Sequence, residues 1–302
     1  MILNDAHCHF FSSGFLELLT RSLPDLPDIG RARVVASRLG WTDPEDVPTL
    51  TTRWTEELDR HDVSRAVLIA SIPGDEDSVG EAVRQHPDRF VGFFMFDPTI
   101  PDAEARLDGA LGELGLRGIC LFPAMHRYRL DDPLVADVFE AAARYRACVF
   151  VHCGVLTVGV RTKLGLPSPF DLRLGDPLAV AAIANGFPGV PVILPHFGAG
   201  FFREALMAAD ACRTIHLDTS SSNSWMKYYP GLGLDAVFRQ ALAVVGPARL
   251  LFGTDSSFFP RGWQKGIHAA QTAALDAIGA TDEDRALIMG GNFDRLFPLG
   301  RS

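Results

Sequence analysis

The segment AVLIASIPGDEDSVGEAVRQHPDRFVGFFMF, residues 66–96, decides the fold class. It begins with the apolar run 66–70 and ends with the apolar run 90–96, and residues 78–85 between them have the spacing of an amphipathic helix. Neither apolar run alternates with polar residues, which is typical of parallel strands that are buried on both faces. The segment therefore predicts one β–α–β unit of a parallel sheet.

The same alternation continues along the chain in both directions. It gives eight strand candidates, each followed by a helical pattern: strands at 2–9, 66–70, 90–96, 118–122, 148–151, 190–194, 214–217 and 250–253, and helices that include 50–60, 78–85, 103–114, 134–145, 178–184, 204–209 and 234–245. Eight such units in 302 residues predict an α/β fold, a (β/α)8 TIM barrel that forms a single domain over residues 1–302. A doubly wound open sheet is the alternative, but its usual Gly-rich first turn does not follow the first strand.

The segment 11–48 interrupts this alternation. It contains four prolines and shows no clear periodicity, and it is too long to be a plain connection. We expect it to form an extended loop cap over one mouth of the barrel after the first strand.

The composition excludes several classes of protein. A net charge of −9 disfavours binding to nucleic acid, whose phosphates carry the same sign. The uncharged stretch 177–202 is broken by prolines and glycines, so we expect no membrane span, and the N-terminus has no basic, apolar targeting pattern. The five cysteines form no CxxC pair, which favours buried free thiols in the cytoplasm. A small-molecule substrate is the expected partner, and a homodimer is compatible with the sequence.

Polar side chains stand at the ends of four predicted strands. His7 and His9 are two residues apart in the first strand and so point to one face, His152 and His196 end the fifth and sixth strands, and Asp255 ends the eighth. Each alone fits an ordinary hydrogen-bonded residue or a helix cap. Together they lie at the carboxyl ends of barrel strands, where barrel enzymes build their sites, and imidazoles with a carboxylate suit Zn²⁺ or another divalent transition metal.

These motifs resemble a known family. Residues 5–9 (DAHCH), 151–154 (VHCG), 195–198 (PHFG) and 253–255 (GTD) are similar to the amidohydrolase superfamily, in particular to the amidohydrolase-related branch that includes aminocarboxymuconate-semialdehyde decarboxylase. The resemblance implies that His7, His9, His152 and Asp255 bind one divalent metal, with Zn²⁺ preferred and Mn²⁺ or another transition metal as the alternative. It also implies that His196, beside Asp255, acts in catalysis as base or acid.

One departure from the superfamily bears on the number of metal ions. Members with two metals bridge them with a carboxylated lysine at the end of the fourth strand, where this chain has Cys-Leu-Phe at 120–122. The three lysines of the chain, Lys163, Lys227 and Lys265, lie elsewhere. A single metal is therefore expected.

The ligand set alone leaves the reaction open. We favour hydrolysis of a small cyclic or aromatic ester, lactone or amide by metal-bound hydroxide. Non-oxidative decarboxylation of a small aromatic or unsaturated acid is the alternative, and an inactive barrel that serves as a binding protein is a more remote one. A nicotinamide-dependent oxidoreductase is disfavoured because no Gly-rich phosphate loop is visible.

Residues just beyond the strands are candidates to bind substrate. Aromatic side chains there would favour a cyclic substrate, although each also fits core packing, and arginines there would hold a carboxylate, although each also fits an ordinary surface. The candidates are Phe11, Phe122, His126, Arg127, Arg161 and Trp225.

Overall fold

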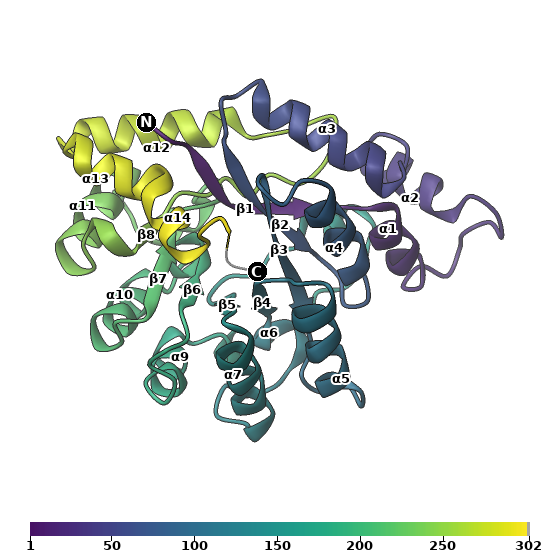
Figure 1. Ribbon diagram of the computed structural model, residues 1–302, viewed down its shortest axis with the longest axis horizontal. Coiled ribbons are helices and arrows are strands. Elements are labelled where there is room, and N and C mark those ends of the chain that lie inside the picture. The colour runs from purple at the N-terminus through teal and green to yellow at the C-terminus, as the bar shows by residue number, and fades with distance from the viewer. Residues whose placement is uncertain (301–302) are drawn as a thin grey trace.

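The protein is a closed ring of eight parallel strands in sequence order, as predicted (Figure 1). The computed structural model describes residues 1–300. The strands are β1 (Asn4–Phe10), β2 (Arg65–Ala70), β3 (Phe90–Phe96), β4 (Gly118–Leu121), β5 (Cys148–Val151), β6 (Val192–Leu194), β7 (Ile215–Asp218) and β8 (Leu250–Leu251). Their consecutive parallel pairing establishes the (β/α)8 TIM barrel.

The first strand closes the ring against the segment that contains and follows the last. The amide of Ala6 donates to the carbonyl of Phe252 at 2.9 Å, and the amide of His9 donates to the carbonyl of Ser256 at 2.7 Å. In the opposite direction, the amide of Asp255 donates to the carbonyl of His7 at 2.9 Å. Backbone hydrogen bonds therefore hold the HxH motif directly beside Asp255.

Helices surround the ring and largely follow the predicted ranges (Figure 1). Two of the best-defined helices begin with an Asp-Pro pair: the carboxylates of Asp132 and Asp176 accept a hydrogen bond from an amide in the first turn, and proline occupies the first helical position. The helices are α1 (Ser13–Thr20), α2 (Arg31–Leu39), α3 (Val47–Asp59), α4 (Glu76–Gln85), α5 (Ala103–Asp108), α6 (Pro123–His126), α7 (Pro133–Tyr145), α8 (Gly159–Lys163), α9 (Pro177–Ala184), α10 (Phe202–Ala211), α11 (Leu234–Val244), α12 (Lys265–Ala277), α13 (Asp282–Ala286) and α14 (Asn292–Leu296).

The strands separate two apolar layers. In β2, Leu68 belongs to the cluster between strands and helices, whereas Val67 and Ile69 belong to the cluster that also contains Phe150 and Cys120 from other strands. Because both faces of the strands are buried, their sequences carry no polar alternation. The inner cluster also includes Phe293 of α14, so the chain end is packed with the barrel interior.

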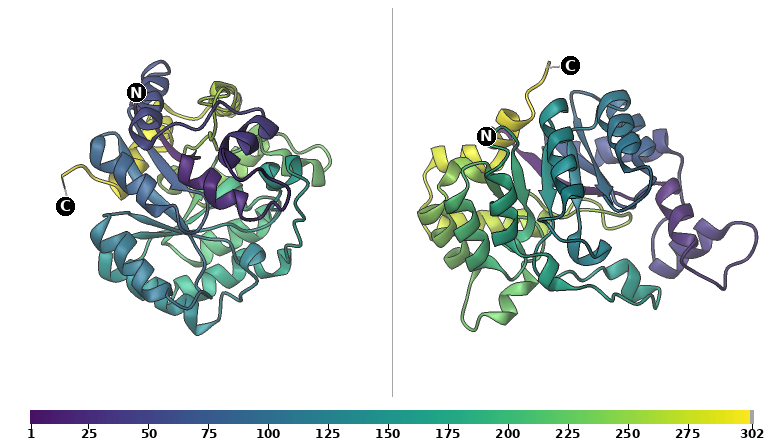
Figure 2. Two further views of the ribbon diagram at one scale, coloured as in Figure 1. Left: turned by 90° about the vertical axis from the view of Figure 1, so that its right-hand side faces the viewer. Right: turned by 90° about the horizontal axis from the view of Figure 1, so that it is seen from below.

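The segment after β1 differs from the expected loop. It contains two helices, α1 and α2, so the prediction of an irregular loop over 11–48 is wrong, although an excursion is present (Figure 2). The Ser12 hydroxyl caps α1 by accepting from the amide of Phe15, and Gly30 and Gly40, both with positive φ, bracket α2. The two helices form a small apolar cluster of their own with Leu16, Val35 and neighbours. We call residues 11–48 the cap.

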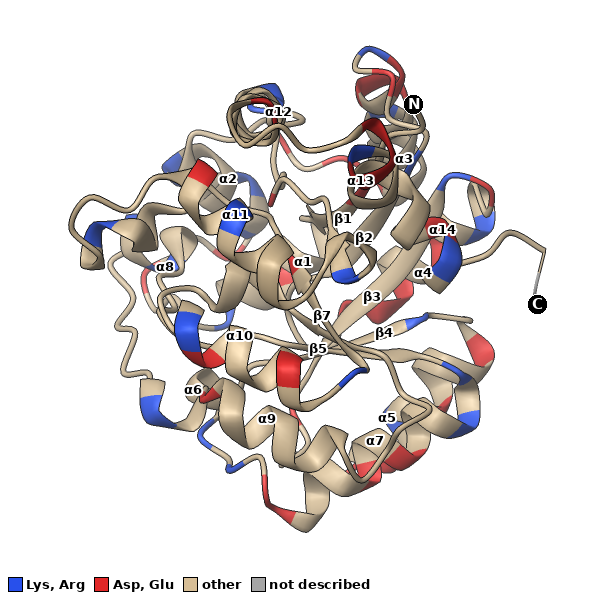
Figure 3. Cartoon of the chain, turned by 90° about the vertical axis from the view of Figure 1, so that its left-hand side faces the viewer, with Lys and Arg blue, Asp and Glu red and all other residues tan. Residues whose placement is uncertain are grey.

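Charge and cysteine placement match ordinary globular packing. Lysine, arginine, aspartate and glutamate lie mainly on the outer helices and loops, with both signs intermixed (Figure 3). All five cysteines are buried free thiols, as predicted. Among residues 1–300, no helix combines the length and apolar character needed to cross a bilayer.

Candidate metal centre

Three of the predicted ligands meet at one mouth of the barrel. The Nε2 atoms of His7 and His9 lie 3.3 Å apart, and Asp255 Oδ1 lies 3.1 Å from His9 Nε2 and 3.7 Å from His7 Nε2. One ligand atom from each of the three residues lies within 4.8 Å of the others. Nitrogen and carboxylate oxygen atoms in this arrangement are suited to hold a divalent metal ion.

Neighbouring side chains orient both imidazoles of the pair. His7 Nδ1 lies 2.7 Å from Asp218 Oδ2, so this nitrogen carries a proton and donates it to the carboxylate. His9 Nδ1 lies 2.6 Å from the Ser71 hydroxyl, which donates its own proton to the carbonyl of Ile69 and therefore accepts from the imidazole. In the neutral imidazoles, both Nε2 lone pairs then face Asp255, an arrangement that places three acceptors together and suits a cation.

A second network connects this centre to His196. The Ser220 hydroxyl lies 2.9 Å from Asp218 Oδ2 and 2.8 Å from His196 Nδ1. Because the hydroxyl has one proton and the carboxylate is its strongest acceptor, Ser220 donates to Asp218 and accepts from His196 Nδ1–H. This assignment leaves Nε2 of His196 as a proton acceptor. Asp218 thus orients His7 directly and His196 through Ser220.

Burial and neighbouring charge set the protonation of these groups. Burial, followed by the charge of His7, lowers the pKa of His196, so its imidazole is neutral near pH 7. Burial and the charges of His196 and His7 lower the pKa of His152 well below its usual value. Burial raises the pKa of Asp255, but the contact with His9 and the charge of the nearby imidazoles outweigh it, so the net shift of this pKa is downward. Burial lowers the pKa of His7, but the Asp218 carboxylate outweighs it, so the net shift of that pKa is upward. The centre therefore combines neutral His152 and His196 imidazoles with an ionised Asp255 carboxylate.

His152 lies beside the three-residue cluster. Its ring centroid is 5.3 Å from that of His196, and its side chain stacks on Phe122 with centroids 5.3 Å apart. Its nitrogens lie outside the 4.8 Å group formed by His7, His9 and Asp255. The role of His152 as a fourth ligand stays a prediction.

The loops at two strand ends hold uncommon backbone conformations. His196 (φ 57°) and Asp255 (φ 61°) both lie in the left-handed region, which costs a non-glycine residue about 1–3 kcal/mol. Gly154 (φ 69°), after His152, packs against the His196 loop, where a Cβ atom would approach the carbonyl oxygen of Gly198 to 2.3 Å. Such strain is concentrated at functional sites in proteins, and here it lies on two predicted catalytic residues.

Asp5, the first residue of the DAHCH motif, fixes the position of the motif. Its buried carboxylate accepts from the amide of His7 at 2.9 Å, from the Thr254 hydroxyl at 2.6 Å and from Trp263 Nε1 at 2.7 Å. One of these donors, His7, lies in β1, whereas Thr254 and Trp263 follow β8. Asp5 therefore holds His7 and the residue preceding Asp255 in register.

One protein family and several relatives match this chain. The family model described as amidohydrolase matches residues 5–299. The chain belongs to the amidohydrolase family. Over 163 residues this amidohydrolase is 23% identical to 2-amino-3-carboxymuconate-6-semialdehyde decarboxylase of Dictyostelium discoideum, a match that covers 51% of this chain and only 43% of that relative.

Solved structures of two named activities share the fold. A 5-carboxyvanillate decarboxylase from Novosphingobium aromaticivorans, with bound manganese and 3-methoxy-4-hydroxy-5-nitrobenzoic acid, superposes with a TM-score of 0.65 at 15% identity, covering 99% of this chain and 97% of that one. A protein named probable 2-pyrone-4,6-dicarboxylic acid hydrolase, from Acinetobacter baumannii, gives a TM-score of 0.61 at 16% identity, covering 98% and 99%. At these identities the comparisons establish the fold and leave the reaction open.

The predicted aromatic substrate residues have different surroundings. Phe11 stacks on His9 with ring centroids 5.6 Å apart, and Phe122 stacks on His152, so both lie at the centre. His126 lies on α6, next to Tyr128, and burial lowers its pKa. Trp225 is 4% exposed and packs among core aromatic residues, donating from Nε1 to Asn223. The contribution of each to substrate binding stays a prediction.

The two predicted carboxylate-binding arginines contact a surface loop. Arg127 donates from Nη2 to the carbonyl of Pro169 at 2.8 Å, and Arg161 donates from Nε to the carbonyl of Pro167 at 2.9 Å. These contacts tie both guanidinium groups to residues 167–170. They leave the predicted role of the arginines in binding substrate untested.

Sequence reasoning missed several residues of the centre: Ser71, Asp218, Ser220 and Arg261. Asp218 had a usable signal, because it ends the seventh strand as His152 and His196 follow the fifth and sixth. The serines had none, since hydroxyl groups of this kind are common and their partners come from other strands.

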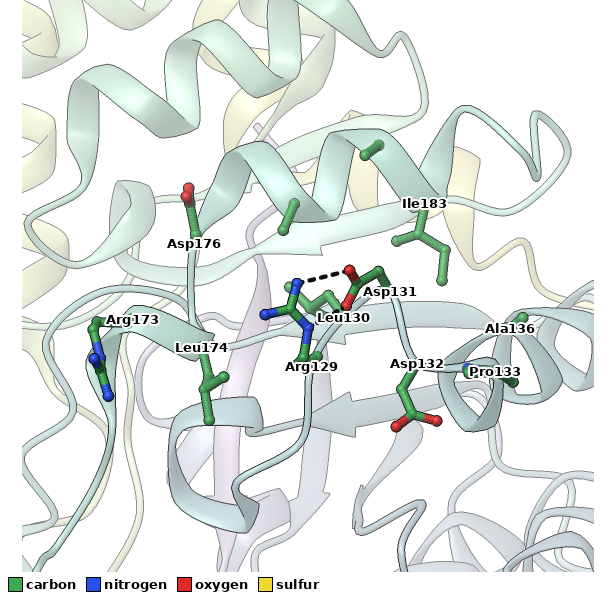
Figure 4. Close-up of a pocket in the computed structure, with 12 residues that line it drawn as sticks. Arg129, Leu130, Asp131, Asp132, Pro133, Ala136, Arg173, Leu174, Asp176 and Ile183 are labelled. Carbon is green, nitrogen blue, oxygen red and sulfur yellow. Dashed lines mark hydrogen bonds and ion pairs between the residues drawn. The ribbon is translucent and has the colours of Figure 1, made fainter.

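A separate cavity of about 570 Å³ lies near the start of α7 and α9 (Figure 4). Arg129 and Asp131, which form an ion pair at 2.7 Å, line it together with Leu174 and Ile183. Among residues 1–300, its lining is drawn from these helices and the loops before them, without the strand-end histidines. This cavity is therefore separate from the candidate metal centre.

Proposed function

We propose that this amidohydrolase is a single-metal enzyme that hydrolyses a small cyclic or aromatic ester, lactone or amide. His7, His9, His152 and Asp255 would hold one divalent ion, with Zn²⁺ as the first choice and Mn²⁺ as the second. The observation that carries the proposal is the convergence of two oriented Nε2 atoms and a carboxylate oxygen within 4.8 Å. The manganese in the 5-carboxyvanillate decarboxylase is consistent with such an ion.

An ion held there would act as a Lewis acid toward a carbonyl group and lower the pKa of a bound water. The residues of the chain supply the proton transfers. Neutral His196 accepts a proton at Nε2 from the attacking water, while its Nδ1–H stays bonded to Ser220. It then returns that proton to the leaving oxygen or nitrogen. The stacked rings of Phe11 and Phe122, on His9 and His152, would face a planar substrate.

Non-oxidative decarboxylation is the second candidate. It is favoured by the names of two relatives, the Dictyostelium discoideum and Novosphingobium aromaticivorans decarboxylases. In that reaction a protonated His196 would give its proton to the carbon that loses CO₂, with the substrate ring against Phe11. The same centre thus serves both reactions, which differ in the direction of the first proton transfer.

The substitution His7→Ala tests the metal centre. We expect metal content, measured by elemental analysis, to fall from about one ion per chain to near zero, with loss of activity. Circular dichroism should stay that of a folded barrel, because His7 lies at the mouth and a barrel is stabilised by its packed layers. Arg203→Gln, on the exposed surface of α10, serves as the control. Full metal content and activity in His7→Ala would refute the proposal.

Labelled water then separates the two reactions. Hydrolysis in H₂¹⁸O places one ¹⁸O atom at the cleaved bond, whereas decarboxylation releases CO₂ and takes a proton from solvent at carbon. A panel of lactones, amides and unsaturated carboxylic acids, assayed with the metal-loaded protein, covers both. CO₂ release without activity on any lactone or amide would replace hydrolysis by decarboxylation.

A further inference from the structure

We infer that Arg261 anchors a carboxylate of the substrate, and that this carboxylate is a group the reaction leaves intact. The inference rests on the proposed function, because it assumes that chemistry occurs at the centre formed by His7, His9 and Asp255. It assigns the substrate to the class of small carboxylic acids that carry a second, reacting group.

The position of Arg261 relative to the metal centre is the first observation. Its Nη2 atom donates to the backbone carbonyl of Asp255 at 3.2 Å and to the hydroxyl of Ser257 at 2.5 Å. Asp255 therefore contacts the guanidinium through its backbone and His9 through its carboxylate. Among the contacts of residues 1–300, Nε and Nη1 have no hydrogen-bond partner, so two donor groups remain for a ligand.

An aromatic platform orients the guanidinium. Its central carbon lies 4.5 Å from the ring centroid of Phe258. The Phe258 ring stacks on Trp41 at 5.0 Å, Trp41 stacks on Phe11 at 4.8 Å, and Phe11 stacks on His9 at 5.6 Å. Three stacked rings therefore connect His9 of the candidate metal centre to the guanidinium of Arg261. Arg261 in turn donates a hydrogen bond to Asp255 of the same centre. A guanidinium held by its face against a ring presents its N–H groups along its edges, where they match a carboxylate.

Local charge favours an anion at this position. The two nearby cap carboxylates are already neutralised, Asp43 by Arg33 at 3.2 Å and Glu45 by Arg53. Within residues 1–300, no carboxylate forms a direct ion pair with Arg261, and the negative charge of Asp255 acts on it from beyond that distance. Lys163 brings a second cation, with its Nζ 5.7 Å from the Phe258 centroid, although this ammonium donates to the carbonyl of Leu39. Arg261 and Lys163, neither of which forms an ion pair with a carboxylate among residues 1–300, therefore lie around the Phe258 ring beside the candidate metal centre.

Arg127 and Arg161 are less suited to the task. Their guanidinium groups donate to the backbone carbonyls of Pro169 and Pro167, whereas that of Arg261 donates to the backbone carbonyl of Asp255. Arg261 is thus in direct contact with a residue of the candidate metal centre. The geometry points to Arg261 before the other two.

The anchored carboxylate is distinct from the reacting group. The reacting bond must lie near the histidine Nε2 atoms, whereas Arg261 contacts the backbone carbonyl of Asp255. An ester or lactone bearing a ring carboxylate fits this requirement for hydrolysis, and a dicarboxylic acid fits it for decarboxylation. Both products keep the anchored carboxylate.

Calorimetric titration of the Zn²⁺-loaded protein tests the inference with 4-hydroxybenzoate and its neutral counterpart 4-hydroxybenzamide. We expect the wild type to bind the acid more tightly, and Arg261→Gln to weaken acid binding by about 10- to 100-fold, the range for a charged hydrogen bond, with little effect on the amide. Arg261→Lys keeps the charge but loses the planar fork, so it should restore part of the preference. Arg203→Gln is the matched control, an exposed arginine on α10.

Two results would overturn the inference. One is an acid-to-amide preference that persists in Arg261→Gln, or that is absent from the wild type. The other is a larger loss of preference in Arg127→Gln or Arg161→Gln than in Arg261→Gln. Phe258→Leu removes the aromatic ring under Arg261 and keeps the arginine. It gives a second measurement of the acid-to-amide preference if Arg261→Gln fails to fold. Failure of the metal centre would appear separately, as absent Zn²⁺ in the wild type before any titration.

Discussion

Asp218 and Asp75 are both buried carboxylates at or beyond the ends of barrel strands, yet they have different partners. Asp218, at the end of β7, accepts from His7 Nδ1 at 2.7 Å and from the Ser220 hydroxyl at 2.9 Å. Asp75, after β2, accepts from two hydroxyl groups, those of Ser12 at 2.7 Å and Ser78 at 2.6 Å. The first carboxylate belongs to the candidate metal centre, and the second ties the cap to the barrel, because Ser12 caps helix α1.

The difference lies in what the donors can do. An imidazole hydrogen-bonded through Nδ1 transmits the carboxylate's influence to its own Nε2, where a metal or a substrate proton is bound. Ser220 passes the orientation by Asp218 on to the imidazole of His196, whereas the hydroxyls of Ser12 and Ser78 hold the Asp75 carboxylate without contacting an imidazole. Burial of a carboxylate therefore indicates function only when its partners carry a reactive atom, and Asp218 meets this condition whereas Asp75 does not.

The largest effect that distinguishes the two regions is expected from His196→Ala. This substitution removes the proton-transfer group that Asp218 orients through Ser220, so we expect kcat to fall by about 10²- to 10⁴-fold. Metal content, measured by elemental analysis, should stay near one ion per chain. If His196→Ala loses metal as completely as His7→Ala, His196 is a ligand and its assignment to proton transfer is wrong.

Asp218→Asn is expected to have the next largest effect. An asparagine cannot serve His7 and Ser220 with a charged acceptor, so the orientation and tautomer of His7 are less well fixed. Loss of such a partner costs about 10- to 100-fold in metal affinity. Competition with a chelator measures that affinity. Asp75→Asn is the matched control. Equal losses of metal affinity in both variants would show that the loss comes from changing a buried carboxylate and not from its contact with His7.

The sequence predicted the barrel and the ends of its strands well. The barrel buries both faces of its strands, so each strand, such as residues 66–70, is apolar along its whole length. The local sequence therefore indicates the parallel barrel. His7, His9 and Asp255 were found because strand ends gather at one mouth whatever the loops do. The cap was mistaken for a loop because Pro24 and Pro27 separate its two short helices and Gly30 and Gly40 bracket α2, which obscures helical periodicity.

Residues that act through space were harder to predict. Asp218 shares β7 with His216, a buried histidine whose Nδ1 contacts the carbonyl of Thr214, and only the position of Asp218 at the end of the strand distinguishes the two. Arg261 follows two phenylalanines and a proline, so its sequence context indicates packing. Its relation to Asp255 depends on how the loop after β8 turns back, which no short pattern encodes.

The smallest effect is expected from Asp75→Asn itself, on stability rather than on activity. Burial raises the pKa of Asp75 from 3.8 to about 6. Between about pH 4 and pH 6 the native protein therefore holds a proton that the unfolded chain has released. This group makes the free energy of unfolding fall as pH rises through that window, and the free energy stays lower above it.

The substitution Asp75→Asn removes this titration. We expect the melting temperature of Asp75→Asn, relative to wild type, to rise from pH 4.5 to pH 7 by several degrees, equivalent to about 1–2 kcal/mol. Asp77→Asn, an exposed acid in the same helical turn, should show no such rise. A difference between Asp75→Asn and wild type that is independent of pH would mean that Asp75 ionises normally, and that its hydrogen bonds to Ser12 and Ser78 compensate for its burial.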